Sequence, residues 1–288
     1  MKQILIISGK GGTGKTVLAA SIAALAKNKV MADCDVDAAD LHLLLQPSIK
    51  EKSIFTGMSK VVVDQARCTG CEECIGICKY EAIVKDGDHN SKVLIDPISC
   101  EGCRVCTYVC PVDAISVYDN ASGEWYISET KYGSMVHAKL GIAEENSGKL
   151  VSIVRQNATK IAQEENSDYV IIDGPPGIGC PVIASLSGVD LALVVTEPTL
   201  SGIHDMERVI GLARHFNVKA ACVVNKFDIN PTNTKNIIDW CKTNEISVFG
   251  KIPYDSSVTE SIVNGVPIVE FTDNTVTEAI KEIWSKLA

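Results

Sequence analysis

The sequence predicts an α/β fold with a doubly wound, mostly parallel sheet, into which a small α+β domain is inserted. Short apolar strands alternate with amphipathic helices over 3–27 and again over 148–287, the order that builds a parallel sheet covered by helices. Between them lies a cysteine-rich segment that is repeated with an offset of 32 residues, from Cys68 to Cys100. We therefore expect one domain at 1–60 and 119–288 and the inserted domain at 61–118.

The composition is that of an ordinary globular protein, with 288 residues, 46% hydrophobic and 22% charged. A net charge of −9 argues against nonspecific binding to nucleic acid or anionic lipid, which requires a positive surface. We expect no signal peptide, because Met1 runs straight into a strand. No apolar run is long enough to span a membrane. Twelve cysteines without an export signal indicate a reducing cytoplasm.

The first expected strand, 3–7, leads into a glycine-rich loop that predicts a phosphate site. The loop matches the P-loop pattern G-x-x-x-x-G-K-T from Gly9 to Thr16. Its backbone N–H groups can close around phosphates, which also face the positive end of the helix expected at 15–27. We expect Lys15 to reach the β- and γ-phosphates and Thr16 to ligate Mg²⁺. The residues expected to bind nucleotide here are Gly11, Gly12, Thr13, Gly14, Lys15 and Thr16.

Lys10, at the start of the loop, makes this a deviant Walker A motif. With it, the sequence resembles the MinD, Mrp and nitrogenase iron-protein group of P-loop ATPases, the SIMIBI class. The resemblance implies ATP hydrolysis by a dimer, formed with itself or with a paralogue, in which Lys10 reaches the partner's nucleotide. A second cation there would offset charge that builds up in phosphoryl transfer. The alternative is a solvated surface lysine.

The second expected strand, 30–33, ends in a run of carboxylates. In the family this segment is switch I, and the resemblance implies that Asp35 positions or deprotonates the attacking water. For Asp37 and Asp40, a helix cap or a solvated turn explains the residue as well as a function does.

Two later strands end in residues expected at the same site. The strand at 169–172 is followed by Asp173, a Walker B arrangement, so we expect Asp173 to hold Mg²⁺ through water. The D-G-P-P-G run that ends at Gly177 resembles switch II, which implies that the Gly177 N–H senses the γ-phosphate. The strand at 219–224 is followed by N-K-F-D. N-K-x-D reads guanine in GTPases, whereas the resemblance implies that Asn225 contacts adenine. The segment alone leaves ATP and GTP open.

Eight of the twelve cysteines form two runs of the pattern C-x-x-C-x-x-C-x-x-x-C, and Pro111 follows the second. Three cysteines two residues apart let one tight loop bind three corners of a [4Fe–4S] cubane. The stretch from 61 to 118 resembles a bacterial 2[4Fe–4S] ferredoxin and departs from it at Lys79, where that family usually has proline. Zinc would leave the cysteine triplets unexplained, and disulfides usually mark small secreted domains.

In two-cluster ferredoxins, the last cysteine of each run serves the other cluster. The first ligand set is therefore expected to be Cys68, Cys71, Cys74 and Cys110. The second is expected to be Cys78, Cys100, Cys103 and Cys106. Cys180 follows switch II and is a candidate labile cluster ligand, with a small buried residue at the head of a helix at 182–186 as the alternative.

The other expected elements connect these motifs. They are a polar linker at 47–60, a hairpin at 125–141, a helix at 148–165 preceded by Glu144 and Glu145, a helix at 202–216 capped by Ser201, helices at 234–243 and 275–287, and strands at 191–195 and 248–252. The last helix has one apolar side and balanced charges on the other, so we expect it to pack on the core rather than on a membrane.

Three functions fit this sequence. In the first, ATP binding closes a dimer and hydrolysis gates electron transfer from two clusters to a partner metalloprotein. In the second, the protein assembles or carries a metal–sulfur cluster, and Cys180 favours this. The third is a MinD-like scaffold or positioning ATPase with structural clusters. Relatives that pair with NifX-like cluster-binding proteins make such an acceptor a possible partner. The expected cofactors are ATP, Mg²⁺ and two [4Fe–4S] clusters.

Overall fold

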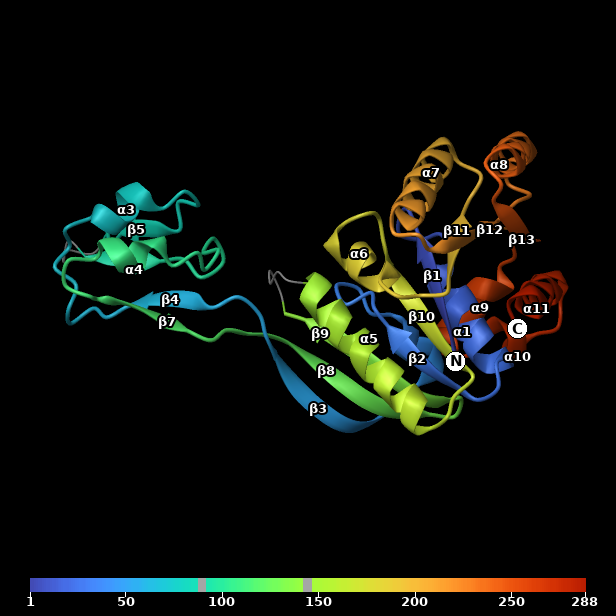
Figure 1. Ribbon diagram of the computed structural model, residues 1–288, viewed down its shortest axis with the longest axis horizontal. Helices are drawn as coiled ribbons and strands as arrows, with labels where there is room; N and C mark the ends of the chain where they lie inside the picture. The colour runs from blue at the N-terminus through green and yellow to red at the C-terminus, as the bar shows by residue number, and fades with distance from the viewer. Residues whose placement is uncertain (88–91, 142–146) are drawn as a thin grey trace. The chain divides into compact units, whose positions relative to one another are not determined.

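The computed structural model describes residues 1–87, 92–141 and 147–288 (Figure 1). The chain divides into two compact units. The large unit comprises Met1–Ser53, Trp125–Lys139 and Ser147–Ala288, and the small unit comprises Ile54–Glu124 and Leu140–Asn146. Glu144 and Glu145 lie outside the described residues. The segment predicted as the insert, 61–118, falls within the small unit.

The large unit is built on a nine-stranded sheet of order β13-β12-β11-β1-β10-β2-β9-β8-β3. Every pair from β13 to β9 is parallel, so the predicted α/β fold with a mostly parallel sheet is confirmed. The strands are β1 (Lys2–Ser8), β2 (Lys29–Asp33), β3 (Ser48–Thr56), β8 (Ala121–Thr130), β9 (Gly133–Leu140), β10 (Tyr169–Pro176), β11 (Leu191–Thr196), β12 (Lys219–Asn225) and β13 (Ser247–Ile252). The predicted hairpin is β8 and β9.

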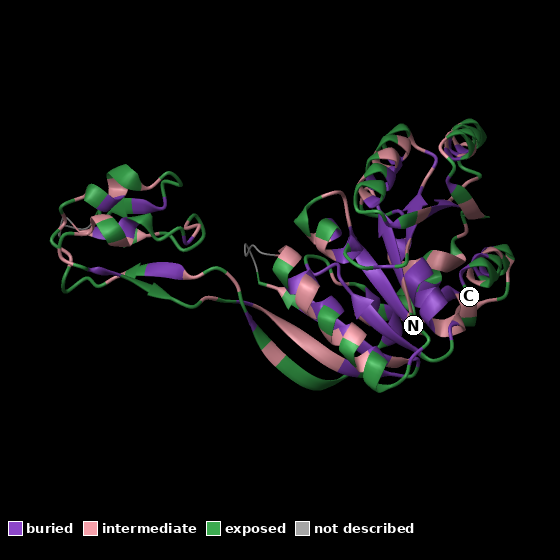
Figure 2. Cartoon of the chain, viewed as in Figure 1, coloured by how far each residue is buried: buried purple, intermediate pink, exposed green. Residues whose placement is uncertain are grey.

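Helices cover both faces of this sheet, and its central strands are buried between them (Figures 1 and 2). One face carries Ile4 and Ile6 of β1, which pack with the apolar sides of α1, α2 and α11. The other face is covered by the helices between β9 and β13. The helices are α1 (Lys15–Leu25), α2 (Leu41–Leu45), α5 (Ser147–Glu164), α6 (Cys180–Leu186), α7 (Leu200–His215), α8 (Pro231–Thr243), α9 (Ser257–Val263), α10 (Ile268–Phe271) and α11 (Thr275–Leu287). As predicted, α11 packs on the core, because Ile280 and Ile283 are buried.

Two expectations about local structure were wrong. The polar linker expected at 47–60 contains β3, which lies at the edge of the sheet. Its residues are polar because nearly all of them are exposed there, so they show no alternating apolar pattern. The N-cap of α7 is Thr199 rather than Ser201, since the Thr199 hydroxyl accepts the Gly202 N–H at 3.0 Å.

The small unit repeats one motif twice, element for element. Its elements are β4 (Lys60–Val63), α3 (Glu73–Ile77), β5 (Ile83–Lys85), β6 (Val93–Ile95), α4 (Val105–Val109) and β7 (Ile115–Tyr118). The strands pair across the two halves, β4 with β7 and β5 with β6, both antiparallel. Glu72 and Arg104, one before each helix, share a left-handed backbone with φ of 66° and 65°. The sequence repeat is therefore a structural repeat.

Candidate functional site

The P-loop joins β1 to α1 and is fastened to the end of β12. Gly14 has a φ of +89°, in the left-handed region that favours glycine. A Cβ on Gly14 would also lie 2.4 Å from Asn225 Nδ2, so the loop and Asn225 can approach only because this residue is glycine. Asn225 Nδ2 donates to the Thr13 carbonyl at 2.8 Å. The two predicted nucleotide-binding elements thus lie together.

Lys15, at the start of α1, lies near the carboxylates of Asp35, Asp173 and Asp33. Its Nζ is 2.6 Å from Asp35 Oδ2 and 4.0 Å from Asp173 Oδ1. Burial by itself lowers the pKa of Lys15, but Asp173 and Asp35 outweigh that effect and the pKa is raised. The lysine is therefore a permanent cation, placed where the P-loop presents its N–H groups. The structure brings together Lys15, Asp35 and Asp173, which lie far apart in the sequence.

Asp173 has the properties of a metal-binding carboxylate. It is fully buried, and neither of its carboxylate oxygens has a hydrogen-bond partner within the described part of the chain. Burial raises its pKa to about 6, against the opposing effect of the Lys15 charge. Buried carboxylates without partners are costly unless they bind a cation. Asp173 and Thr16 therefore fit an Mg²⁺ site, as the Walker B pattern predicts.

Asp33 is a site residue to which the sequence analysis gave no role. Its carboxylate accepts the backbone N–H of Asp35 at 3.1 Å and that of Leu41 at 3.3 Å. It thereby shapes the loop that carries Asp35. Burial, then the charge of Asp173, raises the pKa of Asp33 well above its usual value. The sequence feature that could have indicated this role is the position of Asp33 at the end of β2, two residues before Asp35.

Lys10 points to the segment that follows β11. Its Nζ is 2.5 Å from Glu197 Oε1 and 3.3 Å from the hydroxyl oxygens of Thr199 and Ser201. Glu197 had no predicted role, and a lone glutamate after a strand gave no signal for one. Lys10 is thus ion-paired, not simply solvated.

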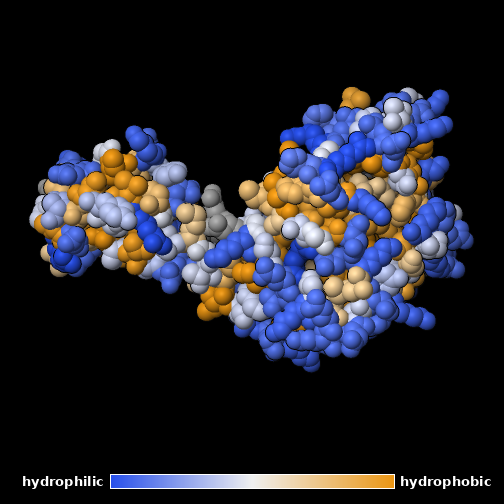
Figure 3. Space-filling view, in the orientation of Figure 1, coloured by the Kyte–Doolittle hydropathy of each residue, from blue (hydrophilic) through white to orange (hydrophobic). Residues whose placement is uncertain are grey.

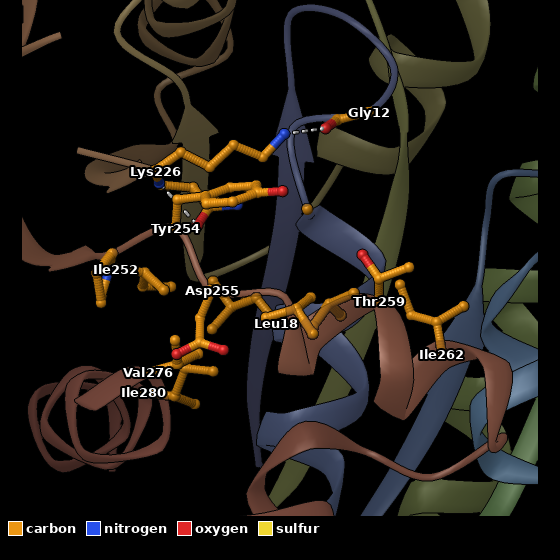
Figure 4. A pocket seen from close by; sticks show the side chains of 15 residues that line it. Gly12, Leu18, Lys226, Ile252, Tyr254, Asp255, Thr259, Ile262, Val276 and Ile280 are labelled. Carbon is orange, nitrogen blue, oxygen red and sulfur yellow. Dashed lines mark hydrogen bonds between the residues drawn. The ribbon is translucent and has the colours of Figure 1, made fainter. Parts of the chain in front are cut away.

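A cavity of about 200 Å³ opens beside the P-loop. Figure 4 shows Gly12, Leu18, Lys226 and Tyr254 around it, with the Lys226 Nζ donating to the Gly12 carbonyl at 3.4 Å. Asn225 also lines this cavity. A mixed apolar and polar cleft next to a phosphate loop suits a nucleotide base. The residues after β13 that line this cavity, such as Tyr254 and Asp255, had no predicted role.

Asp228, the acid of the N-K-F-D segment, does not line this cavity. Its Oδ1 accepts the backbone N–H of Tyr254 at 2.8 Å and so fixes the loop after β13.

Two further predicted residues, Gly177 and Cys180, follow β10. Gly177 has a φ of +92°, and its N–H donates to the Ser8 carbonyl at 2.9 Å. To reach a phosphate, this N–H must leave Ser8. Cys180 is exposed at the start of α6. It lies against α5, because a Cβ added at Gly148 would stand 3.3 Å from its Cβ.

Residues 4–268 match the family model described as the CobQ/CobB/MinD/ParA nucleotide-binding domain. The chain belongs to this family. It is 36% identical to the uncharacterized protein MJ0578 of Methanocaldococcus jannaschii over 290 residues, 99% of this chain and 96% of that protein. The MinD/ParA-type fold is also that of two solved structures.

The first solved structure is a chain of the MinC:MinD cell division protein complex of Aquifex aeolicus, with 22% identity, a TM-score of 0.57, and coverage of 100% of this chain and 95% of that chain. The second is MinD complexed with Mg-ADP from Pyrococcus horikoshii, with 17% identity, a TM-score of 0.57, and coverage of 99% and 95%. These two likenesses concern the fold. The protein is therefore a nucleotide-binding member of the MinD/ParA group with a P-loop.

The eight cysteines of this MinD/ParA-type chain line two separate cavities in the small unit. The first is bordered by Cys68, Cys71, Cys74 and Cys110. The second is bordered by Cys78, Cys100, Cys103 and Cys106. These two groups of four are the ligand sets that the resemblance to two-cluster ferredoxins implies, in which each run gives its last cysteine to the other set.

The thiols within each set lie close enough to affect one another. Burial, followed by the neighbouring Cys100 and Cys103, raises the pKa of Cys106 to about 11. Burial also raises the pKa of Cys74, with contributions from Cys71 and Cys110. Without a ligand, the thiols of Cys74 and Cys106 are therefore expected to stay protonated at neutral pH.

Among the described residues, no group of three or more His, Cys, Asp or Glu could hold a single metal ion. A cubane takes one cysteine on each of four iron atoms, so its ligands surround a cavity instead of meeting at a point. Each of the two cavities is bordered by four cysteines. Within the same residues, no helix is long and apolar enough to cross a bilayer.

Proposed function

We propose that this chain binds and hydrolyses MgATP at the P-loop and holds two [4Fe–4S] clusters in its small unit. In this proposal, nucleotide-driven closure of a dimer gates electron transfer from the clusters to a partner metalloprotein. The single observation that carries it is the distribution of eight cysteines into two cavities of four, on a chain whose other unit is a MinD/ParA-type nucleotide-binding domain.

Hydrolysis would use the residues gathered at the carboxyl ends of the central strands. Lys15 would neutralise phosphate charge, and Asp173 with Thr16 would hold Mg²⁺. Asp35 would orient or deprotonate water. It is bound to Lys15 at 2.6 Å, so phosphates that draw Lys15 away would free the Asp35 carboxylate for this role. Lys10 would complete the charge stabilisation, acting on its own nucleotide or on that of a partner chain.

The small unit depends on its cysteines for its core. Its buried cluster contains Cys74 and Cys106 together with four aliphatic side chains. Such a small core gains stability from a bound metal group. The Ala114 N–H donates to Cys110 Sγ at 3.2 Å, a contact of the kind that tunes cluster potentials. When bound, the clusters would supply one-electron redox chemistry.

A redox partner would need a surface on the small unit near the clusters. Figure 3 shows hydrophobic side chains exposed on this unit. The large side chains exposed on this unit include Tyr108, which is 87% exposed, Ile98, 70%, and Tyr80, 51%. Tyr80 also lines the second cysteine cavity. Exposed large side chains of this kind would suit transient docking of a metal–sulfur or NifX-like acceptor protein in the cytoplasm. The dimer partner would be a second copy of the chain or a paralogue.

A cluster carrier is the second candidate function, and the exposure of Cys180 favours it. A carrier needs a ligand outside the eight cysteines that hold resident clusters. Cys180 is such a thiol and lies next to switch II, where nucleotide could control it.

The experiment is anaerobic electron paramagnetic resonance of the reduced protein, with and without MgATP, together with iron and sulfide analysis. We expect about eight irons per chain and a cluster signal that changes with MgATP. Lys15→Ala should abolish the change, whereas Lys27→Ala, an exposed lysine after α1, should keep it. A cluster signal that ignores nucleotide would rule out electron gating. Loss of clusters to an apoprotein acceptor would favour the carrier. Clusters that neither respond to MgATP nor leave the protein would favour a MinD-like scaffold with structural clusters, and absence of iron would overturn the proposed clusters.

A further inference from the structure

Glu197 lies on a rigid turn between β11 and α7. The Thr199 N–H donates to the Glu197 carbonyl at 2.8 Å, and the Thr199 hydroxyl caps α7. A Cβ on Gly202 would lie 2.4 Å from the same carbonyl oxygen, so the helix packs tightly on this turn. The Glu197 side chain is only 13% exposed. Its carboxylate is therefore fixed in space, whereas Lys10 reaches it through a long side chain.

All the hydrogen-bonding capacity of Lys10 is used at this turn. An ammonium has three N–H donors and no acceptor. Lys10 Nζ lies 2.5 Å from Glu197 Oε1 and 3.3 Å from each hydroxyl oxygen, those of Thr199 and Ser201. These are three acceptors for three donors. Lys10 can therefore contact a phosphate oxygen only by giving up at least one of these partners.

The second carboxylate oxygen of Glu197 is also bound. Lys226 Nζ is 3.4 Å from Glu197 Oε2 and 3.4 Å from the Gly12 carbonyl oxygen. Glu197 thus links Lys10, the second residue of the P-loop motif, to Lys226, which lines the cavity beside the P-loop. Partial burial would raise the pKa of Glu197, but Lys10 and then Lys226 outweigh it, and the pKa is lowered. Glu197 is a stable anion between two cations.

We propose that Glu197 is a positioning residue whose carboxylate occupies the place of a phosphate oxygen at Lys10. Glu197 thereby holds Lys10 until nucleotide causes two chains to pair. Lys10 leaves Glu197 when a phosphate offers it equivalent contacts, so Glu197 sets how readily the paired state forms. This inference rests on the proposed function, in which Lys10 engages nucleotide in a closed dimer. It adds a residue that opposes closure in the absence of nucleotide.

The test is Glu197→Gln, which keeps the size and the acceptor of the side chain but removes its charge. Self-association is measured by analytical ultracentrifugation with Mg²⁺ and adenylyl imidodiphosphate, a non-hydrolysable ATP analogue. We expect the variant to associate about tenfold more tightly than the wild type, a factor that corresponds to about 1.4 kcal/mol. Glu278→Gln, an equal charge change at an exposed position of α11, should associate like the wild type.

A second variant separates positioning from a general structural effect. In a Lys10→Ala background, Glu197→Gln should change association by less than about twofold, because the residue acts through Lys10. A gain that persists without Lys10 would overturn the inference. So would a Glu197→Gln variant that associates as the wild type does, or more weakly.

If neither the wild type nor Glu197→Gln associates, the inference is wrong. Binding of a fluorescent ATP analogue, measured on the same samples, then shows whether the proposed function fails with it. Intact binding removes the inference and the closure of a dimer of identical chains but leaves nucleotide binding in place, whereas absent binding removes the whole proposed function as well.

Discussion

At the scale of single residues, Asp35 is the group on which hydrolysis should depend most. It is buried and held by Lys15 at 2.6 Å, while Asp37 is exposed on the same loop. We expect Asp35→Ala to bind MgATP but to hydrolyse it about 100-fold more slowly, because it loses the group that orients or deprotonates water. Asp37→Ala should keep most of the rate. Steady-state phosphate release with parallel binding measurements checks this. Equal loss in both variants would place the base elsewhere.

His137 should make the large unit sensitive to acid. It is buried, its Nε2 is 2.9 Å from Ser128 Oγ, and its ring stacks on Tyr126 at 4.9 Å. Burial, and then the nearby His42, lowers the pKa of His137 to about 4. In the unfolded chain His137 takes up a proton near pH 6.5, whereas in the folded chain it does so only near pH 4. This group therefore leaves the free energy of unfolding undiminished above pH 6.5 and lowers it as the pH drops from 6.5 toward 4.

Between pH 6.5 and pH 4, the free energy of unfolding should fall by up to about 3 kcal/mol because of His137. His137→Gln should remove most of this pH dependence, whatever its own effect on stability at pH 7.5. Tryptophan fluorescence during denaturant unfolding is a suitable measurement, because Trp125, Trp240 and Trp284 all belong to the large unit. An unchanged pH slope in the variant would show that another group causes the acid sensitivity.

At the scale of elements, each cysteine run should contribute to both clusters. If the cavities describe the ligand sets, Cys110→Ser and Cys74→Ser should lose the same cluster signal, although they belong to different runs. Cys78→Ser and Cys106→Ser should lose the other. Each variant should retain about four irons, and Cys180→Ser should retain about eight. Electron paramagnetic resonance and iron analysis of these variants are the check. If Cys74→Ser and Cys78→Ser, which belong to the same run, lost the same cluster signal, the exchange of ligands between the runs would be contradicted.

The parts of the fold that could be predicted are those whose sequence pattern lies within one short segment. β1, the P-loop and α1 are contiguous, so the sequence predicted them together. The carboxylates around Lys15 could be anticipated only because β2 ends in Asp33 and the strand expected at 169–172 is followed by Asp173, and parallel strands bring such positions to one edge of the sheet. β3 was missed because an exposed edge strand has no apolar alternation. Short helices such as α9 and α10 bury few residues and leave a weak pattern.

The contacts that escaped prediction are those between distant loops. Nothing in the sequence near Glu197 indicates that it binds Lys10, because the ion pair joins the loops after β1 and β11, two strands that are neighbours in the sheet but far apart in the sequence. The same holds for Asp228 and the loop after β13. By contrast, the cysteine sets could be predicted because the chain resembles two-cluster ferredoxins, in which the last cysteine of each run serves the other cluster. The 32-residue repeat by itself shows only which positions are equivalent.

At the scale of the whole molecule, the two units have cores of different kinds. The large unit packs aliphatic side chains from its sheet against α1, α2 and α11. The small unit has a few aliphatic residues, among them Val61 and Ile115, around buried thiols. Since metal binding is coupled to folding where the polypeptide core is small, the units should respond differently to loss of iron.

We therefore expect anaerobic removal of iron by a chelator to unfold the small unit and spare the large one. Amide hydrogen exchange should become fast in β4 and β7, the strand pair that joins the two halves of the repeat. The denaturant midpoint seen by tryptophan fluorescence and the affinity for MgATP should stay the same, because all three tryptophans and the P-loop lie in the large unit. Readdition of iron and sulfide should restore slow exchange. Slow exchange without iron would mean that the polypeptide alone holds the small unit together, and a lowered tryptophan midpoint would mean that the two units fold as one.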